Sequence, residues 1–331
     1  MTLLLAAPAG GATLPRDTVI ETPGPGSARI SATATTGRYP IDAAGRETVA
    51  IGVTSACQAS CTAADPAKIA AFLGTLVHGP EIELLTVQLE TPSQIGFDCG
   101  YGAQACYYGG ENKIVLSGDD APAPDGASRE FVLAHEYGHH LARHRETPAP
   151  FPPAIDWGTA RWASYQNVCR RSRTGSLFPG TLGLRYYRDP GEAFAESFAH
   201  LRFPDAGVPW RWVRALKPDA GALRAIRVDA LDPWRGREAL SLRGRLPGRR
   251  AGPAVRSFST PIDGMVSLRP KGSDRYSLSL LNPAGRVLRS SRHGLSFGNR
   301  LNFTVCGQSS LRLALRSKLR PGAYKLQVQR P

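Results

Sequence analysis

The sequence predicts an α+β protein in which a part built of helices and strands is followed by a small all-β part. Helix-like and strand-like segments alternate up to about residue 237. Eight short alternating apolar runs then follow, separated by turn signals such as Pro247-Gly248, which is typical of a β-sandwich or jelly roll. The charge changes at the same point: residues 1–237 contain 23 Lys and Arg against 24 Asp and Glu, whereas residues 238–331 contain 18 against 3.

Length and composition exclude several classes of protein. The 331 residues, 42% of them hydrophobic, are enough for one large domain or two smaller ones. No run of 18 apolar residues is present, so no membrane-spanning helix is expected. The net charge of +14 comes from the last part of the chain and suggests an anionic partner there. Codon bias is the alternative explanation for the many arginines, but it does not explain why acids become rare after Glu238.

The beginning of the chain and the cysteines predict export. Residues 1–12 are similar to the end of a secretory signal peptide, with a disordered apolar tail as the alternative. Residues 13–45 are rich in Thr, Pro, Gly and Ser and are predicted to be a flexible lead-in or pro-segment. The six cysteines form no CxxC pair, which favours disulfides in an oxidising, extracellular compartment. Short-range pairing of the first four would leave the last two to clamp distant segments, although six cysteines allow 15 connectivities; they are Cys57, Cys61, Cys99, Cys106, Cys169 and Cys306.

Local signals define the elements of the first domain, which we place at residues 46–237. Asp65 is a plausible N-cap with a proline at the next position, and Asp189-Pro190-Gly191-Glu192 is a strong helix start. The strands are predicted at residues 48–54, 82–90 and 112–117, and the helices at residues 65–77, 128–145, 157–170 and 190–202, with an interrupted helical stretch at residues 208–230.

The second domain, residues 238–331, is predicted to hold eight strands. Its alternating runs recur every 8–12 residues, which is the spacing typical of a sandwich. The runs are residues 239–245, 254–260, 264–269, 275–281, 285–290, 300–306, 310–315 and 322–328.

The predicted helix at 128–145 carries the motif His135-Glu136-Tyr137-Gly138-His139, which is H-E-x-x-H. Residues four apart lie about one helical turn apart, so the two imidazoles project from one face and can bind one metal ion. Glu136 lies between them and can act on a metal-activated water. A helix with incidental histidines is the alternative interpretation.

A third protein ligand is needed for a zinc site, and three extensions of the motif are relevant. One form has a Gly three residues after the second His and a third His three residues beyond that Gly. The sequence does not match it, because these positions hold Ala142 and Arg145, and His144 lies one residue too early. The Gly-Thr-x-Asp form fails because Gly158-Thr159 is followed by Ala160-Arg161.

The third form uses a Glu on a second helix with another acid four residues later, and Glu192 and Glu196 fit it. Glu192 is then the metal ligand and Glu196 orients a ligand imidazole. The alternative is a capping box, in which Glu192 bonds the backbone N–H of Asp189 and Glu196 becomes the ligand.

The two motifs together resemble the secreted bacterial zinc metallopeptidases of the gluzincin type. The resemblance implies a zincin-like domain with one Zn²⁺ held by His135, His139 and Glu192, and Glu136 as general base. Candidates for an oxyanion donor are Tyr187, Tyr186 and His200. The strands after residue 238 resemble the bacterial pre-peptidase C-terminal β-sandwich, on stretches such as residues 261–264 and 281–286. The sequence departs from thermolysin-like enzymes in a longer gap from His139 to Glu192 and in the lack of matching calcium sites or a downstream catalytic His.

These patterns predict a secreted zinc endopeptidase acting on protein or peptide substrates. The strand at residues 112–117 would be the edge that an extended substrate joins. The alternatives are a cell-envelope binding protein with a vestigial peptidase domain, and another zinc hydrolase such as a deformylase. No aromatic-interleaved basic helix supports specific nucleic-acid binding.

The arginines of residues 238–331 predict contact with an anionic cell-surface polymer or lipid headgroups, with a solvated basic face as the alternative. Several of them recur at alternate strand positions and are expected to share a face. The residues that carry the positive charge include Arg243, Arg245, Arg249, Arg250, Arg286, Arg289 and Arg292.

Overall fold

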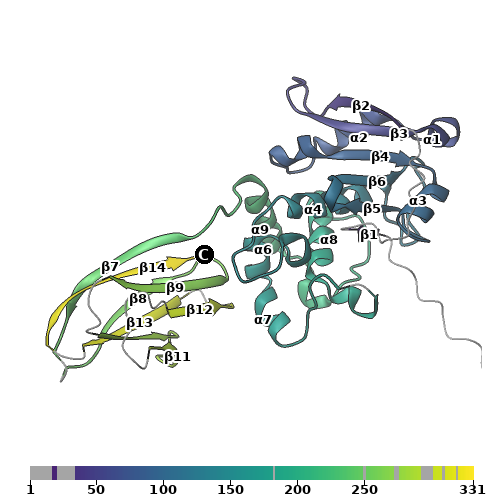
Figure 1. Ribbon diagram of the computed structural model, residues 1–331. Helices are drawn as coiled ribbons and strands as arrows, with labels where there is room; N and C mark the ends of the chain where they lie inside the picture. Colours follow the sequence, from purple (N-terminus) through teal and green to yellow (C-terminus); the bar gives the residue numbers. More distant parts are fainter. Residues whose placement is uncertain are drawn as a thin grey trace, which may run out of the picture. The chain divides into compact units, whose positions relative to one another are not determined.

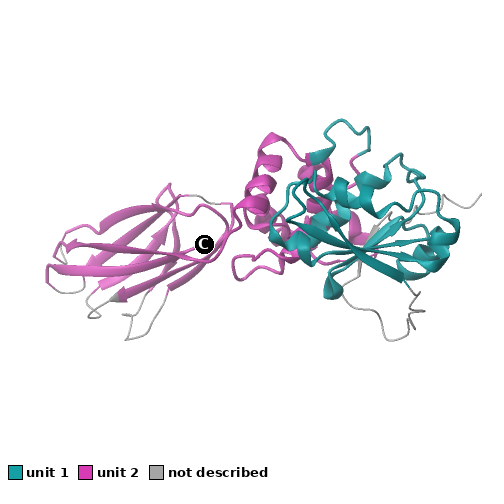
Figure 2. Cartoon of the chain, turned by 90° about the horizontal axis from the view of Figure 1, so that it is seen from above, with its two compact units in different colours: residues 1–140, 202–209 teal, residues 141–201, 210–331 magenta. Residues whose placement is uncertain are grey.

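The structure, a computed structural model, confirms the α+β class. It describes residues 17–20, 34–181, 183–248, 251–271, 276–291, 301–307, 310–317 and 320–331, so the signal-like residues 1–12 lie outside the described part. The chain divides into two compact units, residues 1–140 with 202–209 and residues 141–201 with 210–331 (Figure 2). Within the described residues, no helix is long and apolar enough to cross a membrane.

Unit 1 is built on a six-stranded mixed sheet in the order β1-β5-β6-β4-β3-β2 (Figure 1). Strands β3, β4 and β6 run parallel, whereas β5 is antiparallel to β6 and β2 is antiparallel to β3. The strands are β1 (Asp17–Ile20), β2 (Ala34–Pro40), β3 (Thr48–Thr54), β4 (Thr86–Glu90), β5 (Ala105–Tyr108) and β6 (Lys113–Ser117).

Helices and short turns connect these strands. The predicted helix start at Asp65 is confirmed, because its carboxylate accepts hydrogen bonds from the backbone N–H groups of Ala67 and Lys68. The elements are α1 (Ser55–Ser60), α2 (Pro66–Leu73), η1 (Pro80–Leu84), α3 (Pro92–Asp98), η2 (Gly109–Glu111) and α4 (Arg129–Arg143).

Two sequence-based expectations about this sheet are wrong. Residues 13–45 were expected to be a flexible lead-in or a pro-segment; β1 and β2 lie within them and pair with β5 and β3, so these stretches are not a flexible lead-in, and the pro-segment stays a prediction. The strand at residues 112–117 was expected to be an open edge. It is β6, which pairs with β4 on one side and β5 on the other, so its backbone is not free to bind a substrate. Strand β5 was missed because its four residues lie inside a Cys- and Gly-rich stretch with no alternation.

A buried polar network joins α4 to its neighbours in unit 1. The Tyr137 hydroxyl donates to Glu81 Oε1 at 2.9 Å, and His140 Nε2 lies 2.8 Å from the Glu81 backbone oxygen. His140 Nδ1 lies 3.1 Å from the hydroxyl of Tyr107 on β5. Because these groups are buried, each satisfied contact fixes the rotation of α4 about its axis, and with it the direction of the motif histidines.

Unit 2 begins with a set of mostly short helices. The single helix predicted at residues 157–170 is divided in two, because Asn167 adopts the left-handed conformation with φ 55°. The predicted helix at 190–202 is confirmed at both ends. The elements are α5 (Ala154–Trp157), α6 (Ala160–Tyr165), α7 (Val168–Arg173), η3 (Gly183–Arg188), α8 (Pro190–Arg202), η4 (Arg214–Leu216) and α9 (Ala220–Leu231).

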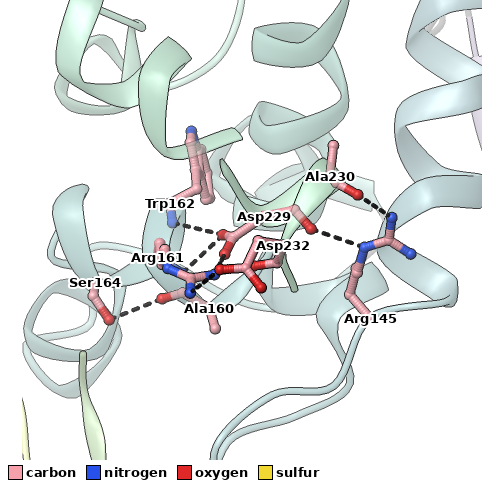
Figure 3. Close-up of polar contacts among 8 residues, drawn as sticks. All are labelled: Arg145, Ala160, Arg161, Trp162, Ser164, Asp229, Ala230 and Asp232. Carbon is pink, nitrogen blue, oxygen red and sulfur yellow. Dashed lines mark hydrogen bonds and ion pairs between the residues drawn. The ribbon is translucent and has the colours of Figure 1, made fainter. Parts of the chain in front are cut away.

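The buried Asp229 of α9 holds several of these segments together (Figure 3). Its carboxylate accepts hydrogen bonds from the backbone N–H groups of Arg161 and Trp162 at the start of α6, and from the Arg161 guanidinium at 2.9 Å. Arg145, just after α4, donates to the backbone oxygens of Asp229 and Ala230 near the end of α9. Arg145, which occupies the position of the third histidine in the longer form of the motif, therefore binds the C-terminal end of α9.

The described residues between 238 and 331 form a β-sandwich of two four-stranded antiparallel sheets, in the orders β11-β10-β13-β8 and β12-β9-β14-β7 (Figure 1). One apolar cluster fills the space between them, with Leu278 and Leu313 from one sheet and Leu268 and Leu326 from the other. All eight predicted strands are present: β7 (Glu238–Leu246), β8 (Ala254–Ser259), β9 (Gly264–Lys271), β10 (Tyr276–Leu281), β11 (Val287–Ser290), β12 (Leu301–Val305), β13 (Ser310–Ser317) and β14 (Gly322–Arg330).

The sandwich and the helices of unit 2 belong to one compact unit, and the start of β7 coincides with the change in charge at residue 238. The division of the chain at residue 237 into independently folding domains stays a prediction. Two backbone N–H groups of the sandwich donate to the helical part: the Asp263 N–H to Ser164 Oγ, and the Met265 N–H to the Ala149 backbone oxygen.

Burial raises the pKa of the Asp263 carboxyl to about 6. The hydrogen bond from the Gly307 N–H and the nearby Arg173 act in the opposite direction and lower this pKa.

All six cysteines are paired, in the arrangement that the sequence favours. The disulfides are Cys57–Cys61, Cys99–Cys106 and Cys169–Cys306. The first two close loops of 4 and 7 residues in unit 1. The third joins α7 to the segment after β12 and closes 137 residues of chain.

Loop length predicts that the third disulfide contributes most to stability. We expect the double variant Cys169→Ser/Cys306→Ser to lose about 4–5 kcal/mol of unfolding free energy, against about 2 kcal/mol for Cys57→Ser/Cys61→Ser. The measurement is urea unfolding followed by far-ultraviolet circular dichroism, which reports on both units, because Cys57–Cys61 lies in unit 1 and Cys169–Cys306 in unit 2. Equal losses in the two variants would contradict the prediction.

Candidate metal centre

The predicted metal-binding residues lie on two helices that are buried nearly all around. On α4, the residues from Phe131 to Ala142 are buried, and His135, Glu136 and His139 are almost completely inaccessible to solvent. On α8, the residues from Pro190 to Ala199 are buried, including both Glu192 and Glu196. Burying imidazoles and carboxylates is costly unless hydrogen bonds or a cation compensate for the lost hydration.

The ligand atoms of His135, His139 and Glu192 converge. One ligand atom from each residue lies within 4.8 Å of the other two. The Nε2 atoms of the two histidines are 3.1 Å apart, and their ring planes are inclined by 68°. Two nitrogens that bind one zinc ion at 2.0–2.1 Å in tetrahedral geometry would lie about 3.3 Å apart. The same separation suits an N–H···N hydrogen bond between the rings when no cation is bound.

A tyrosine hydroxyl donates a hydrogen bond to the carboxylate of Glu192. The hydroxyl of Tyr186, in η3, donates to Glu192 Oε2 at 3.0 Å, and both side chains are buried. The Asp189 N–H, which Glu192 would accept in the capping-box alternative, donates to the Tyr186 backbone oxygen at 2.9 Å. Glu192 belongs to the group that could hold a metal ion, which favours Glu192 over Glu196 as the third ligand.

Asp189 caps α8 by its own side chain. Its carboxylate accepts hydrogen bonds from the backbone N–H groups of Gly191 at 2.8 Å and Thr181 at 2.9 Å. Burial, followed by the neighbouring Glu192 carboxylate, raises the pKa of Asp189 to about 8 against these two hydrogen bonds. Gly191 is required here, because a Cβ at this position would clash with the backbone oxygen of Ile155. The cap thus fixes where α8 begins and which residues face inward.

The remaining predicted residues differ in their burial and in their contacts. Glu196 is fully buried one turn after Glu192, and its Oε1 lies 4.0 Å from His200 Nε2. Glu136, which lies between the two histidines in sequence, is fully buried. Tyr187 is 39% exposed, and its ring contacts those of Tyr186 and Trp212. The role of Tyr187 as an oxyanion donor stays a prediction.

Sequence reasoning did not identify the hydrogen bond from Tyr186 to Glu192. The sequence indicates Tyr186 only as a candidate oxyanion donor. The available signal was its position three residues before the N-cap Asp189, where a turn can direct the ring back over the first turn of the helix. That signal is weak, because the direction depends on the 3₁₀ conformation of η3.

The comparisons with known proteins give little further information. No protein-family model matches the chain, and no curated protein matches it. Among solved structures, a mutant of the lectin-binding domain of lectinolysin in complex with Lewis b matches 29% of this chain and 94% of its own, with 14% identity and a TM-score of 0.19. A structure of the Gx strain of infectious bursal disease virus matches 28% of this chain, with 11% identity and a TM-score of 0.15, and this chain covers 32% of its length.

Proposed function

We propose that the chain is a secreted zinc-dependent endopeptidase with a zincin-like first domain. The observation that carries the proposal is the convergence of His135, His139 and Glu192 in a buried group that could bind a metal ion. Two imidazoles and one carboxylate are a ligand set used by catalytic zinc sites, in which a fourth position stays open. The three disulfides are compatible with an oxidising compartment and support secretion.

The donor set fits zinc better than the cations that prefer oxygen ligands. Mg²⁺ and Ca²⁺ are bound mainly by carboxylates, carbonyls and water, whereas two of the three donors here are imidazole nitrogens. When bound, zinc would polarise the scissile carbonyl and make a water nucleophilic near neutral pH.

The chain's own residues would carry the rest of the reaction. Glu136, between the two ligands on α4, would accept the proton of the attacking water and deliver it to the leaving amine. The Tyr186 hydroxyl would hold the Glu192 carboxylate in one orientation, which is the usual role of a hydrogen-bond partner behind a metal ligand. Glu196, buried one turn along α8, is proposed to orient a ligand imidazole in the same way.

Removal of the metal tests the proposal. With casein as substrate, 1,10-phenanthroline is expected to abolish cleavage and a small excess of zinc to restore it, because Glu136 alone cannot activate water sufficiently. The matched control is 1,7-phenanthroline, which does not chelate and should leave the rate unchanged. Cleavage that both isomers leave intact would overturn the zinc mechanism. A zinc-loaded chain without activity on casein or unfolded peptides would favour the binding-protein alternative.

A further inference from the structure

One outward sheet face of the β-sandwich is strongly basic. Side chains alternate along a strand, so where Leu242, Tyr324 and Leu268 face the core, their neighbours lie on the outer face. On the sheet β12-β9-β14-β7 these outer neighbours include four cations, which we call the basic face: Arg243 and Arg245 on β7, Arg269 on β9 and Lys325 on β14. The three arginines are exposed and Lys325 is half-buried.

The expectation that arginines at alternate strand positions share a face is confirmed for Arg243 and Arg245 on β7. Other arginines of the sandwich lie elsewhere. Arg289 lies on β11 of the other sheet, and Arg286 lies in the turn that precedes it. Arg249, Arg250 and Arg292 lie outside the described residues.

Pairing in this sheet brings like charges together. Arg243 lies directly opposite Lys325 in the register of β7 and β14. Like charges in such positions destabilise a sheet, and an acid at either position would remove the repulsion. Glu238 is the only acidic residue among the described residues of these four strands, and it is paired with Arg330. Stability of the fold alone gives no reason for this arrangement, whereas an anionic ligand does.

The residues between the cations indicate the chemical class of the anionic ligand. Ser241, Gln327 and Gln329 lie on the same face and offer hydroxyl and amide groups. The large hydrophobic residues that are exposed in the described chain all lie outside these four strands, so the face has no apolar anchor for a lipid surface. It also lacks aromatic side chains on which nucleobases could stack.

We propose that the basic face binds a linear acidic polysaccharide. The guanidinium groups of Arg243, Arg245 and Arg269 would pair with its carboxylates or sulfates, because a guanidinium donates two parallel hydrogen bonds to such groups. The ammonium of Lys325 would add a point charge, and the amides of Gln327 and Gln329 would bond sugar hydroxyls. Neighbouring strands lie about 4.8 Å apart and same-face residues about 6.7 Å apart along a strand, so the charges form a closely spaced array. The inference uses no residue of the metal centre and is independent of the proposed function.

The test compares two variants of the full chain that lose the same charge. The face variant is Arg243→Gln/Arg245→Gln/Arg269→Gln/Lys325→Gln, and the control is Arg256→Gln/Arg286→Gln/Arg289→Gln/Arg316→Gln, whose exposed arginines belong to the other sheet and its β10–β11 turn. Binding to heparin and to polygalacturonate is measured by titration calorimetry at several salt concentrations. Each lost pair of exposed charges weakens binding about two- to fivefold, so the face variant should bind at least about tenfold more weakly than the wild type. The control should stay within about threefold.

Wild-type affinity for at least one of the two polymers should fall as salt rises, because exposed charges are screened within about 8 Å at 0.15 M. Four outcomes would overturn the proposal. The first is no binding to either polymer at low salt, and the second is equal loss in the two variants, which would indicate an effect of net charge only. The third and fourth are equally tight binding to phosphatidylserine-containing vesicles or to single-stranded DNA.

Discussion

Glu136→Gln is expected to lower the rate of peptide hydrolysis by about 10²–10⁴-fold, because an amide cannot accept the proton that a general base removes. Zinc binding should stay at one ion per chain, since Glu136 does not belong to the group of converging ligand atoms. Gln has nearly the same shape as Glu, so packing in the buried α4 should be retained. The rate with casein and the zinc content are measured on the same preparation.

The matched control for this variant is Glu130→Gln on the same helix. Glu130 is half-buried, makes an ion pair at 3.6 Å with the buried Arg129 and is not one of the converging ligand residues, so its replacement should leave the rate almost unchanged. Loss of zinc together with activity in Glu136→Gln would show that the residue has a structural or metal-binding role. It would contradict the proposal that Glu136 transfers protons without binding the metal.

The second large effect concerns the third ligand. Glu192→Gln is expected to weaken zinc binding far more than Glu196→Gln, because only Glu192 contributes an atom to the converging group. Loss of a residue that merely orients a ligand typically costs 10–100-fold in metal affinity, which is the range expected for Glu196→Gln. The zinc dissociation constants are measured by competition with a chelating dye. If Glu196→Gln has the larger effect, the roles of the two carboxylates are exchanged.

The orientation of Glu192 gives this prediction a further readout. Tyr186→Phe removes the hydroxyl that donates to Glu192 Oε2 but keeps the buried ring, which packs edge-on against Trp212 at 5.1 Å. If the hydroxyl positions the ligand, this variant should weaken zinc binding by about 10–100-fold without changing the thermal midpoint of the zinc-free chain. An equal loss in zinc-free stability would indicate a packing role only.

Local signals in the sequence predicted those elements that local chemistry determines. The helix α8 begins where Asp189 and Pro190 predict it, because an Asx side chain and a proline act within one turn. The eight strands of the sandwich follow from alternation, since each strand buries one face in the shared core. The pairing of Cys169 with Cys306 followed from the proximity of the other four cysteines in sequence.

Features that depend on distant segments were not predictable in this way. Strand β5 is fully buried and four residues long, so it has no alternation, and its place between β1 and β6 is determined by pairing. The strand β6 therefore was expected at an edge and lies inside the sheet. Likewise, the sequence Asp189-x-x-Glu192 suits a capping box, but a turn at Tyr186 supplies the acceptor for the Asp189 N–H and leaves Glu192 for other contacts.

The most direct test of the central claim is the zinc content of the intact chain by native mass spectrometry. The wild type and His139→Ala are loaded with excess zinc and desalted under identical conditions. The proposed site predicts one zinc ion per wild-type chain and none in His139→Ala, because the variant lacks one of the two imidazoles that lie 3.1 Å apart. A wild-type chain without zinc, or a His139→Ala chain that retains as much zinc as the wild type, would contradict the assignment of the metal centre.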